Sequence, residues 1–215
     1  MTVKDIEREV RNLLGQPDPA NSRWDSSILR TWMNDGQELA VLEGEILKDE
    51  RYTTSVIGQE EYALPPDCLA ITAIYFDGER LTRRVQSFLD ERVSQWRTAA
   101  SSTPKIYYNK RILERTKTIG LHPKPDSEKR IDLMMLKTPA ILTSGDSVPE
   151  IPDEFHRAII YYVCYRAKLE SGEAGQNEAN VLFQEFMARI TRLKSNSQLE
   201  DRDTPLTMIM GDQKI

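Results

Sequence analysis

Two histidines, His122 and His156, and two cysteines, Cys68 and Cys164, are the side chains best suited to metal binding or nucleophilic catalysis. Zinc sites place such residues in close groups, with spacings of a few residues between ligands. Here the four lie far apart, and neither histidine has a second ligand at metal-binding spacing. Each histidine is predicted to be structural or at the surface, and each cysteine to be a buried, reduced thiol. We predict no catalytic residue, no cofactor and no metal site.

The usual catalytic sequence signatures are also missing. The sequence contains no Gly-x-Ser-x-Gly, no Walker loop, no Gly-x-Gly-x-x-Gly and no His-Glu-x-x-His. Acidic pairs such as Glu60-Glu61 and Asp90-Glu91 are neighbours in the sequence and are expected to be solvated. A glycosidase-type carboxylate pair is defined in space rather than in sequence. A cell-wall hydrolase therefore stays open as an alternative class.

Basic residues form two small clusters, one on an expected strand and one around a pair of tyrosines. They are Arg80, Arg83 and Arg84, and Lys105, Lys110 and Arg111 beside Tyr107 and Tyr108. Cations interleaved with aromatic rings bind nucleic acid, but exposed strands also carry cations to block edge pairing, which is the favoured interpretation. The 215 residues include 29 Lys and Arg against 34 Asp and Glu, a net charge of -5. That balance argues against a broad phosphate-binding face.

Helical spacing of apolar residues marks both ends of the chain. In residues 1–50 a first helix is expected with Val3, Ile6 and Val10 on one face. A second helix begins at Asp25 or Ser26 and runs to about residue 48. Two more helices are expected in residues 149–195, the first of them opening after Pro152. We expect these four helices to pack as one bundle.

Between these helical segments the pattern changes to that of β-strands. In residues 51–148, β-branched and aromatic residues alternate with polar ones between turn residues, and Asp77-Gly78 is a hairpin signal. This pattern predicts an inserted antiparallel sheet with one short helix over residues 87–96. The predicted fold class is α+β: an α-helical bundle of about four helices, an inserted β-rich lobe, and a C-terminal extension over residues 196–215.

The C-terminal extension is polar until Pro205 and then becomes apolar at Leu206, Met208, Ile209 and Met210. Exposed apolar residues of this kind invite aggregation. Two interpretations stay open: a disordered tail, or a tethered peptide that docks into the groove of a partner, with Met providing adaptable contacts.

Membrane and secretory features are not expected. The segment MTVKDIEREVRNLLG is charged and amphipathic and lacks the apolar core of a signal peptide. No segment approaches the ~18 consecutive apolar residues of a membrane span. We therefore expect no membrane partner.

Four segments resemble head-to-tail connector (adaptor) proteins of tailed bacteriophages, of the tail-tubular or head-completion type that lies beneath the portal. They are residues 24–37, with a Trp…Trp-x-Asn-x-x-Gln pattern; residues 62–69, with Tyr-x-Leu-Pro-x-Asp; the meander of residues 104–125; and the helix-opening residues 151–159. Each segment is a cap, a turn or a packing feature rather than a chemical motif.

The resemblance implies a non-enzymatic structural virion protein of the neck between capsid and tail, present in the host cytoplasm during assembly. It implies a ring of about twelve copies that joins head to tail and extends the DNA channel. The implied partners are the portal protein, a downstream tail or nozzle protein, other copies of the chain, and passing double-stranded DNA that is not bound sequence-specifically. Twelve copies at -5 would carry roughly -60, a field that repels phosphate.

The extension resembles the adaptor segment that inserts between portal subunits. Leu206, Met208, Ile209 and Met210 are therefore the candidate portal-binding residues. Another neck or tail component, such as a stopper or tail-tube protein, is the main alternative, and the cell-wall hydrolase is a more distant one.

Overall fold

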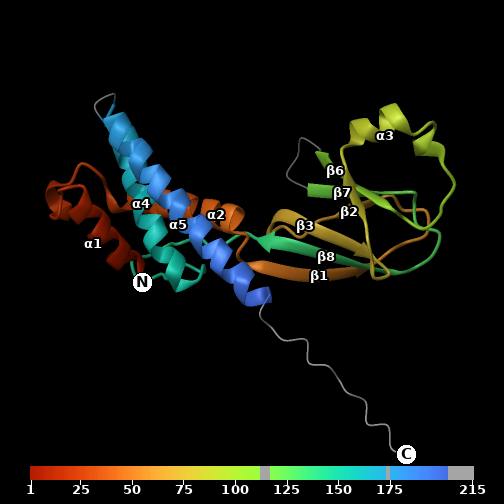
Figure 1. Cartoon of the computed structure of the whole chain (residues 1–215), viewed down its shortest axis with the longest axis horizontal. Helices are drawn as coiled ribbons and strands as arrows, with labels where there is room; N and C mark the ends of the chain where they lie inside the picture. The colour runs from red at the N-terminus through yellow and green to blue at the C-terminus, as the bar shows by residue number, and fades with distance from the viewer. Residues whose placement is uncertain (112–116, 173–174, 203–215) are drawn as a thin grey trace, which may run out of the picture. The chain divides into compact units, whose positions relative to one another are not determined.

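The computed structural model describes residues 1–111, 117–172 and 175–202, and the chain divides into two compact units (Figure 1). The helical unit comprises Met1–Glu45 and the chain from Pro139 onward, and the β unit comprises Ile46–Thr138. Each unit buries its own set of apolar side chains.

The helical unit contains helices from both ends of the chain. They are α1 (Val3–Leu13), α2 (Ser26–Gly44), α4 (Asp153–Leu169) and α5 (Gln176–Arg202), with a short 3-10 helix at Pro19–Asn21. Helix α4 packs against α1, α2 and α5, and it lies side by side with α5 (Figure 1).

Two of the predicted helix ends are wrong. Helix α2 ends at Gly44 rather than near residue 48, because Glu45 adopts a left-handed conformation with φ 51°. Helix α5 continues to Arg202, so residues 196–202, predicted to belong to the extension, are helical. Neither Gly nor Pro interrupts the sequence there until Pro205, and the polar residues before it are compatible with a helix.

Local signals explain where the first and fourth helices begin. The hydroxyl of Thr2 accepts a hydrogen bond from the backbone N–H of Asp5, whose carboxylate accepts one from the backbone N–H of Thr2. This capping box satisfies two donors that the start of α1 would leave free. Helix α4 follows Pro152 and has Asp153 and Glu154 in its first turn, as predicted, where carboxylates are favourable.

A buried polar network joins α1 to the start of α2. Arg11 is only 3% exposed, and its Nε and Nη2 donate to Glu7 Oε1 at 2.9 and 2.6 Å. Its Nη1 donates to the carbonyl of Trp24 at 3.0 Å. Trp24 packs edge-on against Trp32, with ring centroids 5.1 Å apart, and Trp32 is a core residue as predicted.

The β unit contains two four-stranded sheets and a short helix. The strands are β1 (Lys48–Thr54), β2 (Glu61–Ala63), β3 (Cys68–Phe76), β4 (Glu79–Arg80), β5 (Thr82–Arg84), β6 (Ile106–Arg111), β7 (Lys117–His122) and β8 (Arg130–Lys137); the helix is α3 (Gln86–Arg92). The first sheet has the order β1-β8-β3-β4 and the second β2-β7-β6-β5. The predicted helix over residues 87–96 is shorter than expected, and Trp96 begins a separate 3-10 turn, Trp96–Thr98.

The prediction of a single antiparallel sheet is wrong, because the chain crosses between two sheets after the Asp77-Gly78 turn. The backbone N–H of Leu81 donates to Ile74 of the first sheet at 2.8 Å, whereas that of Thr82 donates to Lys105, beside the second, at 2.9 Å. Strand β5 consequently pairs with β6 in parallel. One core joins the two sheets: Ile74, Phe76, Ile131, Leu133 and Met135 from the first, and Tyr62, Tyr107, Ile119 and Leu121 from the second.

Candidate interaction surfaces

The two histidines are buried, and they belong to different units. His156 is buried; its Nε2 donates to the carbonyl of Ile151 at 2.9 Å, and its Nδ1 lies 3.0 Å from the amino group of Met1. His122 packs edge-on against Trp96, with ring centroids 5.9 Å apart. Burial lowers the pKa of His122, and the charge of Glu60 opposes that shift only in part.

Both cysteines are buried and free, as predicted. Burial raises the pKa of the Cys164 thiol to about 12. It also raises the pKa of Cys68, although the charge of Lys117 works against the shift. Within the described ranges, no group of three or more His, Cys, Asp or Glu side chains could hold a metal ion.

The adjacent carboxylates Glu60 and Glu61 are partly buried and paired, not solvated as predicted. Glu60 accepts a hydrogen bond from the hydroxyl of Tyr108 and lies 3.6 Å from Lys124 Nζ. Glu61 pairs with Lys110. Burial, followed by the hydrogen bond to Glu60, raises the pKa of Tyr108. Each carboxylate is held by its own partners, an arrangement that stabilises the second sheet.

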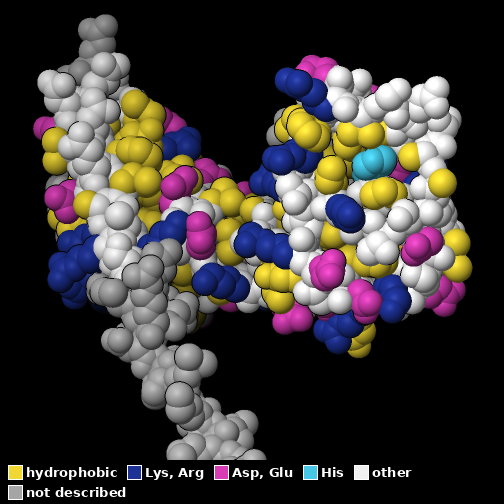
Figure 2. All heavy atoms as spheres, turned by 45° about the vertical axis from the view of Figure 1, so that its right-hand side comes forward, with side chains coloured by type: hydrophobic (Ala, Val, Ile, Leu, Met, Phe, Trp, Pro, Cys, Tyr) yellow, Lys and Arg dark blue, Asp and Glu magenta, His cyan; other side chains and the backbone are white. Residues whose placement is uncertain are grey.

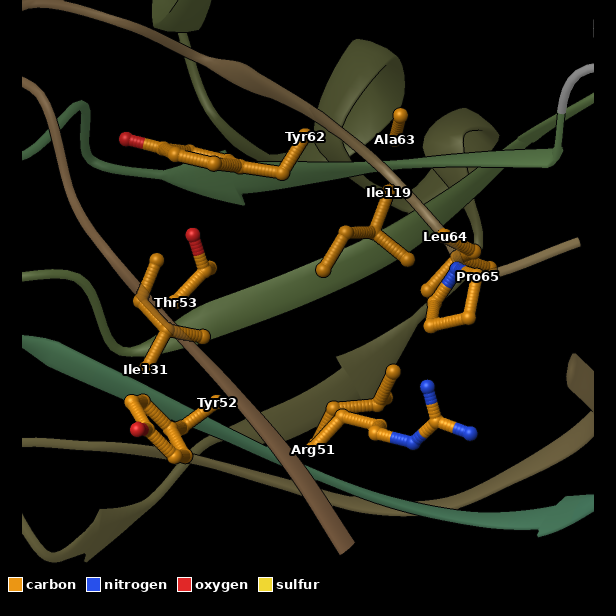
Figure 3. Close-up of a pocket in the computed structure, with 10 residues that line it drawn as sticks. Arg51, Tyr52, Thr53, Tyr62, Ala63, Leu64, Pro65, Ile119 and Ile131 are labelled. Carbon is orange, nitrogen blue, oxygen red and sulfur yellow. The ribbon is translucent and has the colours of Figure 1, made fainter.

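The β unit has an apolar groove at one pair of sheet edges. The groove measures about 290 Å³, and its lining residues are Arg51, Tyr52, Thr53, Tyr62, Ala63, Leu64, Pro65, Ile119, Ile131 and Leu133. Strands β1 and β2, which flank it, are edge strands of the two sheets. In Figure 3, Ile119 and Ile131 lie between Tyr62 on one side and Tyr52 on the other.

The groove is open because β1 places polar residues on its core side. Arg51 and Thr53 pair with Leu133 and Ile131 of β8, whose side chains belong to the core, yet both residues of β1 are exposed. Arg51 is neutralised by Asp49 and Asp67 at 2.8 and 3.0 Å. An unpaired strand edge beside an apolar floor with neutralised charges is suited to an extended, apolar segment.

A second cavity, which we call the basic hollow, lies at the opposite pair of sheet edges. It measures about 370 Å³ and is lined by Ile71, Thr72, Ala73, Arg80, Leu81, Thr82, Arg83 and Tyr107. Strands β4 and β5, on which its two arginines lie, are the other edge strands of the two sheets. Figure 2 shows Lys and Arg side chains interspersed with hydrophobic and acidic ones on the face of the β unit turned towards the viewer.

The structure brings together the two basic clusters that the sequence showed separately. Parallel pairing of β5 with β6 places Arg83 opposite Tyr107 and Arg84 opposite Tyr108. The backbone of Lys105 is hydrogen-bonded to β5. Periodicity could not reveal this, because a parallel pairing of residues about twenty-five positions apart has no local signal. The side chain of Arg111 lies outside the described part.

The predicted portal-binding residues Leu206, Met208, Ile209 and Met210 lie outside the described residues. Among the residues that are described, no helix has both the length and the apolar character needed to cross a membrane.

Comparison with known protein families supplies the class of protein. The family model of the SU10 adaptor protein matches residues 1–209, which include both units. The chain therefore belongs to the SU10 adaptor protein family, and it is a structural adaptor protein of a phage. The resemblance seen in the sequence is confirmed at this level. No curated protein matches the chain.

Proposed function

We propose that the chain is a head-to-tail connector that forms a ring of about twelve copies under the portal, joins head to tail and extends the DNA channel. The observation that carries the proposal is the family match over residues 1–209, because it covers the helical unit and the inserted β unit together. An adaptor must contact a protein on each side, and the β unit offers two distinct cavities at opposite sheet edges. The net charge of -5 per chain suits a channel through which DNA slides without being held.

The attachment to the portal is assigned to Leu206, Met208, Ile209 and Met210. These apolar residues follow α5, which ends at Arg202. Each copy would contribute a modest binding energy, and a ring would multiply it through many simultaneous contacts. The downstream tail or nozzle protein would bind elsewhere on the ring.

The test is binding of the full chain to the portal protein of the same phage. Full-length chain, a chain that stops after Arg202, and a chain with Leu206→Asp and Met208→Asp are compared in co-sedimentation with assembled portal. We expect only the full-length chain to bind, with unchanged circular dichroism for all three. Undiminished binding by the two altered chains would remove the tail from the interface, and preferential binding of the full chain to tail-tube protein would favour a stopper or tail-tube component.

A further inference from the structure

Charge is divided unevenly between the two units. Residues 46–138 contain 16 Lys and Arg against 13 Asp and Glu, a net charge of +3, whereas the rest of the chain contains 13 against 21, a net charge of -8. An overall value of -5 therefore hides a basic β unit and an acidic remainder. Opposite net charges on two parts of one chain favour contacts between copies in which unlike parts meet.

Four cations that have no acidic partner in the described part of the chain lie at or beside the basic hollow, and one of them, Arg84, stacks on the ring of Phe88 at 4.9 Å. Arg80 and Arg83 line it, and Arg84 and Lys105 lie on or beside the same strand pair. All four are exposed, and none makes an ion pair within the described ranges. By contrast, Arg51, the arginine that lines the apolar groove, is paired with Asp49 and Asp67.

The hollow also has apolar and hydroxyl surface next to its arginines. Tyr107, Leu81 and Ile71 contribute apolar atoms, and Thr72 and Thr82 contribute hydroxyl groups. Val85, which directly follows the last residue of β5, is 67% exposed. A partner that fits this surface carries carboxylates together with an apolar side chain.

Helix α2 carries a surface of that composition. Its residues 31–44 contain three acidic residues and no Lys, Arg or His, and the C-cap residue Glu45 adds a fourth carboxylate. Asp35, Glu38 and Leu42 are exposed and lie three and four residues apart, which places them on one face of the helix. Glu38 makes no ion pair in the described part of the chain, and Asp35 has a long one to Arg166 at 3.6 Å.

We propose that the basic hollow of one copy binds the acidic face of α2, formed by Asp35, Glu38 and Leu42, on a second copy. This contact is heterologous, since it joins two different surfaces, and repetition of a heterologous contact closes a ring when the rotation allows. The inference rests on the proposed ring and names the surfaces that meet between its subunits. Double-stranded DNA is the less suitable occupant, because the same chain carries -8 outside the β unit and phosphate repels that charge.

The first experiment measures self-association by sedimentation velocity at low salt. The variants are Arg80→Glu with Arg83→Glu, which reverses the hollow, and Asp35→Lys with Glu38→Lys, which reverses the helix face. Each pair of substitutions alone is expected to weaken self-association by at least about tenfold. Added salt is expected to weaken the self-association of the wild-type chain, because it screens the charges. Arg92→Glu, an exposed arginine of α3 that does not line the hollow, is the matched control and should change little.

Mixing the two reversed variants gives the sharpest outcome. Each retains one intact surface, so the mixture should regain association through one normal contact, and the two reversed surfaces, which now carry opposite charges, should be able to pair as well. A mixture that remains monomeric, or reversed variants that associate like the wild type, would overturn the proposal.

Disulfide cross-linking detects the same contact even when it is too weak to be seen by sedimentation. Chains carrying Arg83→Cys and Glu38→Cys are mixed and oxidised with copper phenanthroline, with Arg92→Cys in place of Arg83→Cys as the control. The 83–38 pair is expected to yield several times more mixed disulfide than the 92–38 pair, and equal yields would contradict the proposal.

Binding of a DNA duplex tests the other occupant. If the duplex binds in a salt-sensitive way, and Arg80→Glu with Arg83→Glu abolishes that binding without affecting self-association, the hollow binds phosphate and the proposal is overturned. Portal binding that depends on residues 203–215 is measured separately, so failure of the ring contact is distinguishable from failure of the portal assignment.

Discussion

Tyr108 and Gly120 face each other across the β6–β7 ladder, and the ring of Tyr108 occupies the space where a side chain at residue 120 would begin. The ring cannot move away easily. It is 1% exposed, its hydroxyl donates to Glu60, and the edge of Trp96 packs against it with centroids 5.6 Å apart. The second sheet is therefore built around a glycine that permits close approach.

Gly120→Ala is expected to destabilise the β unit by about 2–3 kcal/mol, since the added methyl group overpacks a filled site. Urea denaturation followed by tryptophan fluorescence, to which Trp96 contributes from the β unit, measures the cost. Shortening the opposing residue, in Tyr108→Leu, should make the alanine much less costly, so a double-mutant cycle should show strong coupling. Additive effects of the two substitutions would mean that the ring does not limit residue 120.

Arg11→Met is expected to cost about 3–5 kcal/mol, because it leaves the Glu7 carboxylate in a site that is largely shielded from water and without its cation. Arg8→Met on the same helix is the control. Arg8 pairs with Asp5 at the surface, 69% and 37% exposed, and such pairs contribute about 0–1 kcal/mol. Chemical denaturation followed by far-ultraviolet circular dichroism compares the two variants, and equal costs would contradict the buried network.

His122 is expected to make the β unit less stable as the pH falls. Burial lowers its pKa in the folded chain, so the unfolded chain binds the proton first, at its ordinary pKa of about 6.5. Stability from this residue is therefore complete above about pH 6.5 and declines as the pH falls towards the folded value. His122→Phe should show a flatter stability profile between about pH 7.5 and 5, and an unchanged slope would contradict this role.

The two thiols are expected to react slowly with thiol reagents in the folded chain. Burial raises the pKa of Cys164 to about 12 and that of Cys68 above its ordinary range, so little thiolate forms near neutral pH. Labelling with a disulfide reagent should be slow in buffer and rapid for both thiols in denaturant. Rapid labelling of either thiol in the native chain would show that its surroundings open readily.

Much of the fold could be predicted from sequence because the relevant signals are local. The apolar spacing of Val3, Ile6 and Val10 and the acidic first turn of α4 gave helices in the right places. The alternation of apolar and polar residues predicted strands, and Asp77-Gly78 predicted a turn. The two thiols and Trp32 are buried as predicted.

The partition of strands between two sheets could not be predicted, because it depends on which carbonyl each amide of Leu81 and Thr82 meets in three dimensions. The same pairing creates the basic hollow from residues about twenty-five positions apart. Similarly, the openness of the apolar groove depends on Arg51 and Thr53 facing the core side of β1, a register that a polar strand does not specify by itself.

The most direct test of the central proposal is a cryo-electron microscopy reconstruction of the neck of the phage that contains this chain. We expect density for the helical and β units repeated in a ring against the portal, with the segment after Arg202 in contact with portal subunits. A ring in which the chain touches only tail proteins, or a neck that lacks it, would contradict the assignment as a portal-bound connector.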